Sequence, residues 1–290
     1  MKLALGTAQF GQPYGIANQL GKVSQSEVSS ILRYCEVAGV QTIDTANNYG
    51  TSEAALGLAG VSNFDVITKI QAIPTSCLDV SAWLDKQVHK SLSRLKVKNL
   101  YGVLIHRPEQ LFGSFGQIFL KALIELKEFG SINKIGVSIY DPVELDEILK
   151  LYNFDIVQAP FNIVDQRLFN SGWLEKLKTN NVEVHCRSCF LQGLLLMDRE
   201  KVPKKFRSWD SLFDKWHTWL LENGSVTRAE ACLSFVKSFQ GIDKIVVGVD
   251  NQNQLEHLVA SFAKDVQIES LPNLSNNDMK LINPSNWGKL

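Results

Sequence analysis

The chain lacks three features that would place it in a special class of protein. None of its apolar runs reaches 18 residues, so we expect no membrane-spanning helix. Its 30 Lys and Arg residues balance 30 Asp and Glu residues, so the net charge gives no reason to expect nucleic acid or a membrane surface as a partner. It has only five cysteines, an odd number scattered over 290 residues. That usage argues against a disulfide framework and favours reduced thiols in the cytoplasm.

Two further motifs are missing from the amino-terminal segment, MKLALGTAQFGQPYG. It carries one Lys and an early GTAQ break, which predicts a first strand and its loop rather than a secretory signal. The same turn is not a GxGxxG sequence that opens directly into a helix, so a Rossmann-type dinucleotide site is not expected. No linker or low-complexity stretch interrupts the chain. We therefore expect residues 1–290 to form one domain.

Apolar, strand-like runs alternate with amphipathic, helix-like runs almost throughout. The predicted strands are Leu3–Thr7, Gln41–Asp44, Asp65–Lys69, Leu100–His106, Lys134–Ser138, Asp155–Gln158, Val182–Arg187 and Lys244–Val249. The predicted helices are Gln25–Ala38, Ser52–Leu58, Val80–Leu95, Phe115–Phe129, Pro142–Leu151, Leu168–Thr179, Thr227–Phe239 and Gln252–Phe262. Eight strand–helix pairs predict an α/β protein, a single (β/α)8 TIM barrel. An open, doubly wound parallel sheet is the alternative.

The segment Lys201–Gly224, after the seventh strand, elaborates this pattern and carries three of the six Trp residues. It could be a lid over a substrate or the core of an inserted helix. The helical spacing of Trp216, Trp219 and Leu220 favours the core. The last residues, Leu271–Leu290, are expected to be irregular. This tail, the Lys201–Gly224 segment and the loop Phe10–Asn18 are the expected walls of a substrate pocket.

Polar side chains stand at or just after the ends of three successive predicted strands. Asp44, Lys69 and His106 end strands two, three and four, and Tyr49 follows in the loop after Asp44. Each taken alone has an ordinary structural explanation, such as a helix cap, a loop anchor or a surface lysine. In a barrel, however, the carboxyl ends of all strands open on one side and line one active-site mouth. We therefore expect these four residues to converge.

An acid, a phenol, an amine and an imidazole together can donate a proton to a carbonyl oxygen. A free tyrosine has a pKa near ~10, too high for ready donation at neutral pH. A neighbouring ammonium stabilises the phenolate, and a carboxylate holds that ammonium in place. A neutral imidazole can orient the carbonyl. The set predicts carbonyl reduction, with Tyr49 as the general acid and Asp44, Lys69 and His106 in support.

Longer strings give a more specific prediction. They are LGTAQFG, DTANNYG, TKI, LIHRP, GVSIYDP, VQAPFNIVDQR, SCFLQGLL and VVGVDNQNQLEHL. With these strings the chain resembles the aldo-keto reductase superfamily over nearly its whole length. The resemblance implies a barrel that binds NADP(H) or NAD(H), no metal, and a catalytic tetrad of Asp44, Tyr49, Lys69 and His106. It implies cofactor contacts from Gly6, Thr7, Ser138, Gln158, Arg187, Ser188, Leu191, Gln192, Gly193, Leu194, Gly248, Asp250 and Gln254.

Three positions depart from the family pattern. Ile139 replaces the Asn that usually follows the Ser of GVS, and Arg187 stands where a Tyr usually stacks on the nicotinamide. A guanidinium plane can also stack on a ring. Residues 245–263 contain no Lys or Arg, although the family usually has a basic residue there for the 2′-phosphate, and they include Asp250. The family favours NADP(H), but Asp250 keeps NAD(H) possible, and Arg228 or Lys264 could compensate.

Two other functions remain open from the sequence. One is an enzyme that uses a tightly bound nicotinamide transiently, in epimerising or dehydrating a sugar derivative, with no net turnover of the cofactor. The other is a non-catalytic, nicotinamide-sensing subunit, which the intact tetrad disfavours. The substrate is expected to be a small carbonyl compound or alcohol of unspecified identity. Cys186 and Cys189 form a C-x-x-C, but without a helix start or a second pair we expect both to be packing residues.

Overall fold

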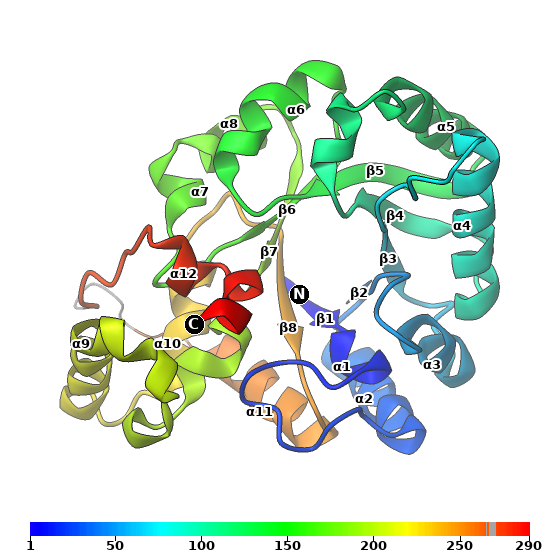
Figure 1. The fold of residues 1–290 in the computed structure, drawn as a ribbon. Coiled ribbons are helices and arrows are strands. Elements are labelled where there is room, and N and C mark those ends of the chain that lie inside the picture. The colour runs from blue at the N-terminus through cyan, green and yellow to red at the C-terminus, as the bar shows by residue number, and fades with distance from the viewer. Residues whose placement is uncertain (265, 267–270) are drawn as a thin grey trace.

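Eight parallel strands close into a barrel in the computed structural model, with helices arranged around the outside (Figure 1). The structure describes residues 1–264, 266 and 271–290. The strands are β1 Leu3–Gly6, β2 Thr42–Asp44, β3 Asp65–Ile70, β4 Leu100–Ile105, β5 Ile132–Ser138, β6 Ile156–Pro160, β7 Glu183–Arg187 and β8 Lys244–Gly248. They follow one another around the barrel in chain order, and β8 pairs with β1. The (β/α)8 prediction is confirmed, and the open sheet is wrong.

Helices lie between the strands, as the alternating pattern predicts. The α-helices are α1 Ala8–Gly11, α2 Gln25–Ala38, α3 Ser52–Ala59, α4 Val80–Leu95, α5 Gly116–Glu128, α6 Leu145–Leu151, α7 Arg167–Asn170, α8 Trp173–Thr179, α9 Asp210–Glu222, α10 Arg228–Lys237, α11 Gln252–Ala263 and α12 Met279–Ile282. The short 3-10 helices are η1 Pro108–Phe112, η2 Pro142–Glu144, η3 Leu191–Leu196, η4 Arg199–Lys201, η5 Lys204–Trp209 and η6 Pro284–Lys289. Within the described residues, none of the helices is long and apolar enough to cross a membrane.

Local signals set several helix ends. The side chain of Ser24 caps α2 by accepting a hydrogen bond from the Glu27 N–H, and α2 ends at Gly39 in the left-handed conformation. One predicted helix is wrong in a single respect: Leu168–Thr179 is divided into α7 and α8. Gly172, with φ of 76°, interrupts it, because a left-handed residue cannot continue an α-helix.

The barrel interior is closed at the amino-terminal end of its strands. Ile67, Leu104 and Ile156 form an apolar layer inside the barrel. Below it, Tyr101 donates a hydrogen bond to Glu183. Lys134 donates a hydrogen bond to the Tyr101 hydroxyl and forms an ion pair with Glu183. Burial would raise the pKa of Glu183, but hydrogen bonds led by those of His185 and Lys134 lower it to about 2. These side chains fill the bottom of the barrel, so a site can open only at the carboxyl ends.

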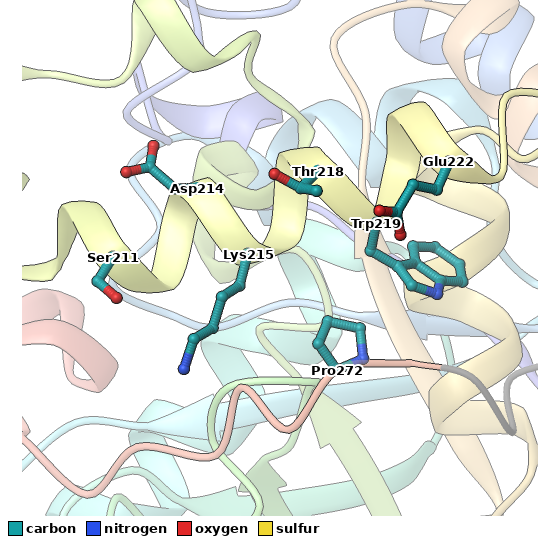
Figure 2. Close-up of a pocket in the computed structure, with 7 residues that line it drawn as sticks. All are labelled: Ser211, Asp214, Lys215, Thr218, Trp219, Glu222 and Pro272. Atoms are coloured by element: carbon teal, nitrogen blue, oxygen red, sulfur yellow. The ribbon is translucent and has the colours of Figure 1, made fainter.

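The elaborated segment after β7 is built from aromatic core. Trp216 and Trp219 of α9 are buried and stack with ring centroids 5.8 Å apart, and the Trp216 indole donates to the Leu195 carbonyl at 3.1 Å. The core interpretation of this segment is therefore correct. A shallow depression of about 550 Å³ lies between α9 and Pro272 (Figure 2), lined by Asp214, Trp219 and other side chains of one face of α9.

The carboxyl-terminal tail is less irregular than expected. It contains α12 and η6, and Trp287 packs edge-on against Phe206 with ring centroids 4.9 Å apart. The Trp287 indole also donates to the Leu281 carbonyl at 2.9 Å. The apolar content of the tail is therefore used to bind it to the segment after β7.

Candidate active site

The four predicted catalytic residues lie together at the carboxyl ends of β2, β3 and β4. The Lys69 ammonium donates to Asp44 Oδ2 at 2.6 Å and to the Tyr49 hydroxyl at 3.4 Å. A third bond goes to the Thr45 carbonyl at 2.9 Å. His106 meets the Tyr49 ring edge-on, with ring centroids 6.1 Å apart. Asp44, Lys69 and Tyr49 thus form one hydrogen-bonded group, and His106 joins it through the ring contact.

The charges of this group are fixed by its surroundings. Burial would lower the pKa of Lys69, but Asp44 and Tyr49 outweigh burial and raise it above its ordinary value. Burial, together with the nearby charges of Lys69 and Arg187, lowers the pKa of His106 to about 4. At neutral pH the site therefore presents a charged ammonium and a neutral imidazole.

A second layer holds Asp44 in place. The buried Gln158 amide donates to Asp44 Oδ1 at 2.7 Å, so both carboxylate oxygens have partners. Ser138 Oγ in turn donates to Gln158 Oε1 at 3.3 Å. Gln158 and Ser138 are two of the residues expected to hold the nicotinamide carboxamide; in the structure Gln158 orients the Asp44 carboxylate and Ser138 contacts Gln158.

Close contact between two loops positions Tyr49. A Cβ on Gly11 would lie 1.6 Å from the Tyr49 carbonyl oxygen, and a Cβ on Gly50 would lie 2.3 Å from the Gly11 oxygen. Gly50 also has φ of 54°, so a side chain is excluded at both positions. Next to them the buried Ser52 hydroxyl donates to the Thr7 carbonyl at 2.8 Å. The β1 and β2 loops are thereby joined beneath Tyr49.

A cavity of about 390 Å³ opens beside the tetrad, within the range of small-molecule and cofactor sites. Its lining residues among those predicted are Gly6, Thr7, Asp44, Tyr49, Gln158, Arg187, Ser188, Gln192, Gly193, Gly248, Asp250 and Gln254. Other lining residues, which the sequence did not single out, are Ala8, Gln9, Tyr14, Gly15, Ala17, Asn18, Cys189, Phe190, Leu196, Val246, Val247, His257 and Leu258. Of the three expected walls, only the loop Phe10–Asn18 contributes to this lining.

The structure does not place three of the predicted cofactor residues in the lining. Leu191 and Leu194 are buried in the hydrophobic core, and Ser138 reaches the site through Gln158. The two leucine side chains anchor their turn in the core, so that other residues of the same turn face the cavity. Gln192 and Gly193 of that turn do line it.

The wall after β7 is unusually strained. Ser188, Leu191 and Gln192 have positive φ angles of 62°, 48° and 52°, and Gly193 follows with 89°. A positive φ costs a non-glycine residue energy, and such residues cluster where ligands are held. The Asn162 amide donates to the Ser188 carbonyl at 3.0 Å and fixes the start of this wall.

Arg187 lines the cavity, and contacts with Tyr140 and Ile139 fix its side chain. Its guanidinium lies over the Tyr140 ring, 4.4 Å from the centroid, and donates to the Ile139 carbonyl at 2.9 Å. The residue that departs from the family pattern after GVS thus supplies the acceptor that fixes Arg187. Stacking of the Arg187 guanidinium on a flat ring in the cavity stays a prediction.

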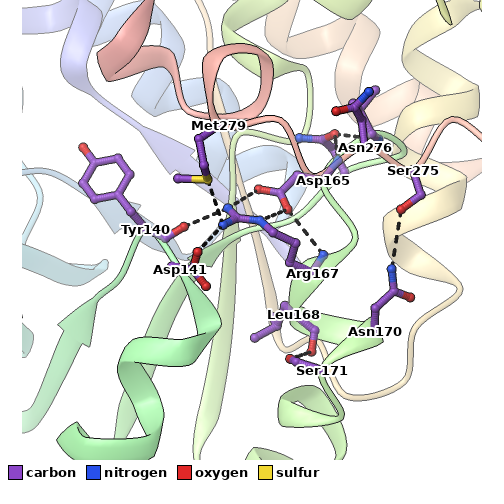
Figure 3. Close-up of polar contacts among 12 residues, drawn as sticks. Tyr140, Asp141, Asp165, Arg167, Leu168, Asn170, Ser171, Ser275, Asn276 and Met279 are labelled. Carbon is purple, nitrogen blue, oxygen red and sulfur yellow. Dashed lines mark hydrogen bonds and ion pairs between the residues drawn. The ribbon is translucent and has the colours of Figure 1, made fainter.

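An ionic cluster behind this wall joins three segments of the chain (Figure 3). Arg167 donates to the buried Asp165 through Nε at 2.9 Å and Nη2 at 2.9 Å. It also donates to Asp141 Oδ2 at 2.7 Å and to the Tyr140 carbonyl at 2.9 Å, and it contacts Met279 of α12. The motif VQAPFNIVDQR, whose role the sequence left open, therefore supports the loop that carries Tyr140.

Several cavity residues escaped sequence reasoning because their signals are tertiary. Tyr14 lies in a loop with no periodicity, and its hydroxyl accepts from Gln192 Nε2 at 3.2 Å across 178 positions. The Asn18 amide donates to Asp250 Oδ1 at 3.1 Å, across 232 positions. The sequence predicts that the loop Phe10–Asn18 is a wall of the pocket, but not these partners.

Comparison with known proteins agrees with the geometry. The family model for the aldo/keto reductase family matches residues 2–276, and the chain belongs to that family. Members of the family use nicotinamide cofactors and act on small carbonyl compounds. No match is found among curated proteins.

Solved structures with the same fold are only distantly similar in sequence. The aldo-keto reductase AKR11C1 from Bacillus halodurans, in its holo form, is 19% identical, with a TM-score of 0.75 over 94% of this chain and 90% of that chain. The glycerol dehydrogenase AKR11B4 from Gluconobacter oxydans is 22% identical, with a TM-score of 0.70 over 92% of this chain and 88% of that chain. At such identities the likeness shows the fold.

The C-x-x-C pair lies in the core. Cys186 and Cys189 are buried, and burial raises the pKa of each thiol well above its usual range. Cys189 packs against the Cys232 carbonyl. A buried, protonated thiol is a poor nucleophile.

We expect iodoacetamide to alkylate Cys77 first in the native protein, because its side chain is the only one of the five cysteines that is not buried. Cys186 and Cys189 should be labelled only after unfolding. Mass spectrometry of peptides from native and urea-treated protein measures this. Rapid native labelling of Cys189 would contradict the core assignment and restore a reactive role for the pair.

Proposed function

We propose that this protein is an NAD(P)(H)-dependent oxidoreductase that reduces a small carbonyl compound to an alcohol, or catalyses the reverse reaction. One observation carries the proposal: a hydrogen-bonded chain from Asp44 through Lys69 to the Tyr49 hydroxyl at the edge of the cavity. The five free cysteines support a reducing compartment, and we place the protein in the cytoplasm.

Each tetrad residue has a role in moving one proton. Tyr49 would protonate the carbonyl oxygen in reduction and take the proton back in oxidation. Lys69, 3.4 Å from the Tyr49 hydroxyl, would stabilise the phenolate that proton transfer leaves. Asp44 holds the ammonium at 2.6 Å. The neutral His106 would orient the carbonyl by hydrogen bonding, without adding a second positive charge.

The residues around the cavity fit a nicotinamide dinucleotide. The cavity is lined both by Asp44 and Tyr49 of the tetrad and by residues of the β8–α11 connection, and its strained wall at Ser188–Gly193 is of the kind found at binding sites. Gln158 and Ser138 would hold the carboxamide, and Arg187 would lie against the ring. A bound nicotinamide supplies the hydride; the protein supplies position and the proton. The family resemblance favours NADP(H), with NAD(H) as the alternative.

The proposal is tested by incubating the purified chain with NADH or NADPH and a panel of aldehydes, ketones and oxidised sugar derivatives. Absorbance at 340 nm follows loss of the reduced cofactor. Turnover with at least one carbonyl, and binding of one cofactor tighter than about millimolar, is expected. Tightly bound nicotinamide with product formation but no net change in absorbance would favour transient use of the cofactor. Absence of binding would refute the proposal.

We expect the His106 imidazole to stay uncharged at and around neutral pH. Its pKa of about 4 lies below the ~6.5 of an unperturbed histidine. Between these two values the unfolded chain takes up a proton that the folded chain refuses, so stability from this group falls as the pH drops from 6.5 toward 4. We expect the nuclear magnetic resonance signal of the His106 ring, assigned with His106→Gln, to titrate below pH 5. A midpoint above pH 6 would contradict a neutral imidazole.

A further inference from the structure

The two ends of the cavity belong to different parts of the barrel. Asp44 and Tyr49 line it at β2, whereas Asp250, Gln254 and His257 line it at the β8–α11 connection, and β1 lies between β2 and β8. If the proposed function holds, the reacting nicotinamide lies beside Tyr49. The adenosine half of an extended dinucleotide then reaches the β8–α11 end. NAD(H) and NADP(H) differ only there, at the 2′ position of the ribose.

We propose that this end of the cavity selects NAD(H) over NADP(H), and that Asp250 is the specificity-determining residue. The half-buried Asp250 carboxylate faces the cavity, and the Asn18 amide orients it with a hydrogen bond of 3.1 Å to Oδ1. A carboxylate can accept a hydrogen bond from a ribose 2′-hydroxyl. A 2′-phosphate would bring further negative charge against it, and like charges at close range are strongly unfavourable.

As far as the structure describes the cavity lining, it offers no lysine or arginine at this end to offset that repulsion. Arg187 is the one such residue in the cavity lining, and it lies at β7, bound to the Ile139 carbonyl. The two residues that could have compensated are engaged by carboxylates. Arg228 pairs with Asp198 at 3.1 Å, and Lys264 pairs with Glu230 at 2.5 Å.

Further carboxylates border the same end. Glu27 accepts a hydrogen bond from the Gln252 backbone at 2.6 Å, and Glu256 accepts one from the Gln252 side chain at 2.7 Å. These groups lie around the start of α11, next to Asp250. Neither carboxylate lines the cavity, so the direct contact with Asp250 carries the discrimination and reverses the preference that the family resemblance gives.

Calorimetric titration of the full chain with NADH and with NADPH tests the inference. The titrations are made at pH 8. We expect NADH to bind about 100-fold more tightly than NADPH, the scale of a like-charge contact in a partly buried site. Equal affinities, or tighter NADPH, would overturn the inference and leave the proposed function standing. Failure of both to bind would overturn the proposed function, and the inference with it.

Substitution of Asp250 tests whether this residue causes the difference between the NADH and NADPH affinities. Asp250→Ser should lower the ratio of NADPH to NADH dissociation constants at least about 10-fold, because it removes both the acceptor and the repulsion. Glu256→Gln is the matched control: it removes the same charge beside the site, but Glu256 does not line the cavity, so the ratio should stay within about twofold. An unchanged ratio in Asp250→Ser would refute the role of Asp250.

If Asp250→Ser fails to fold, competition by fragments of the cofactor tests the inference in the unaltered chain. Adenosine 5′-monophosphate should compete with NADH, whereas adenosine 2′,5′-bisphosphate, which adds only the 2′-phosphate, should compete about 100-fold less well. Equal competition by the two fragments would show that the β8–α11 end does not discriminate, and would refute the inference.

Discussion

Tyr49→Phe should bind cofactor as tightly as the parent protein but reduce carbonyl compounds two to four orders of magnitude more slowly, the usual contribution of a positioned general acid. The substitution keeps the ring, its edge contact with His106 and its place over Lys69. It removes only the hydroxyl that receives the Lys69 hydrogen bond at 3.4 Å. Single-turnover absorbance measurements report the rate, and calorimetry reports the binding.

Tyr14→Phe is the matched control. Tyr14 lines the same cavity and loses only a hydrogen bond with Gln192. Its effect on the rate should be less than about tenfold, because the hydroxyl has no connection to the ammonium. If the two phenylalanine variants were equally slow, hydration of the cavity rather than proton donation would account for the loss. Near-normal turnover in Tyr49→Phe would remove the proposed mechanism and favour a nicotinamide-sensing subunit.

Lys69→Met tests the contribution of the ammonium in the Lys69–Tyr49 pair. Without the ammonium, the phenolate formed by proton transfer has no counter-charge, so a loss similar to that of Tyr49→Phe is expected. The double variant should lose less than the product of the two single losses, because residues that act as one unit are not additive. Additive losses would mean that the two residues work separately.

The barrel and the position of the tetrad could be predicted because both follow from local patterns. Strands buried on both faces are continuous apolar runs, and their ends mark one face of the barrel. Asp44, Lys69 and His106 each stand at or just after such an end. The positions of α2 and α4 followed from their amphipathic periodicity, and both agree with the structure to the residue. Tyr49 was found through its place in the following loop.

The remaining features depend on contacts between distant segments. The contact of Gly11 with Gly50, which holds the Tyr49 loop, joins two loops about forty positions apart. The pairing of Lys264 with Glu230 is equally invisible in the sequence, yet it removes a cation that could have met a phosphate. Of the residues named from the sequence, Gln158, Arg187 and Gly248 line the cavity at or near strand ends, whereas the irregular first loop was named only as a whole, without Tyr14 or Asn18 individually.

The most costly structural substitution we expect is Arg167→Met. Asp165 is 1% exposed in its side chain and receives two hydrogen bonds from the Arg167 guanidinium. Removing one partner of a buried ion pair leaves the other charged and unpaired, at a cost of about 3–5 kcal/mol. The same guanidinium also holds Asp141 and the Tyr140 carbonyl (Figure 3), so the loop beneath Arg187 should loosen as well.

Urea unfolding of Arg167→Met and Arg107→Met measures this difference. Arg107 also pairs with a carboxylate, Glu109 at 3.8 Å, but both side chains are more than 60% exposed. An exposed pair contributes at most about 1 kcal/mol, so Arg107→Met should unfold nearly as the parent does. Arg167→Lys should fall between them, because an ammonium keeps the charge but cannot donate to Asp165, Asp141 and Tyr140 in the geometry of a planar guanidinium. If Arg167→Met were no less stable than Arg107→Met, the cluster behind the cavity wall would not stabilise the fold, and the support that it gives to Tyr140 and Arg187 would have to come from packing alone.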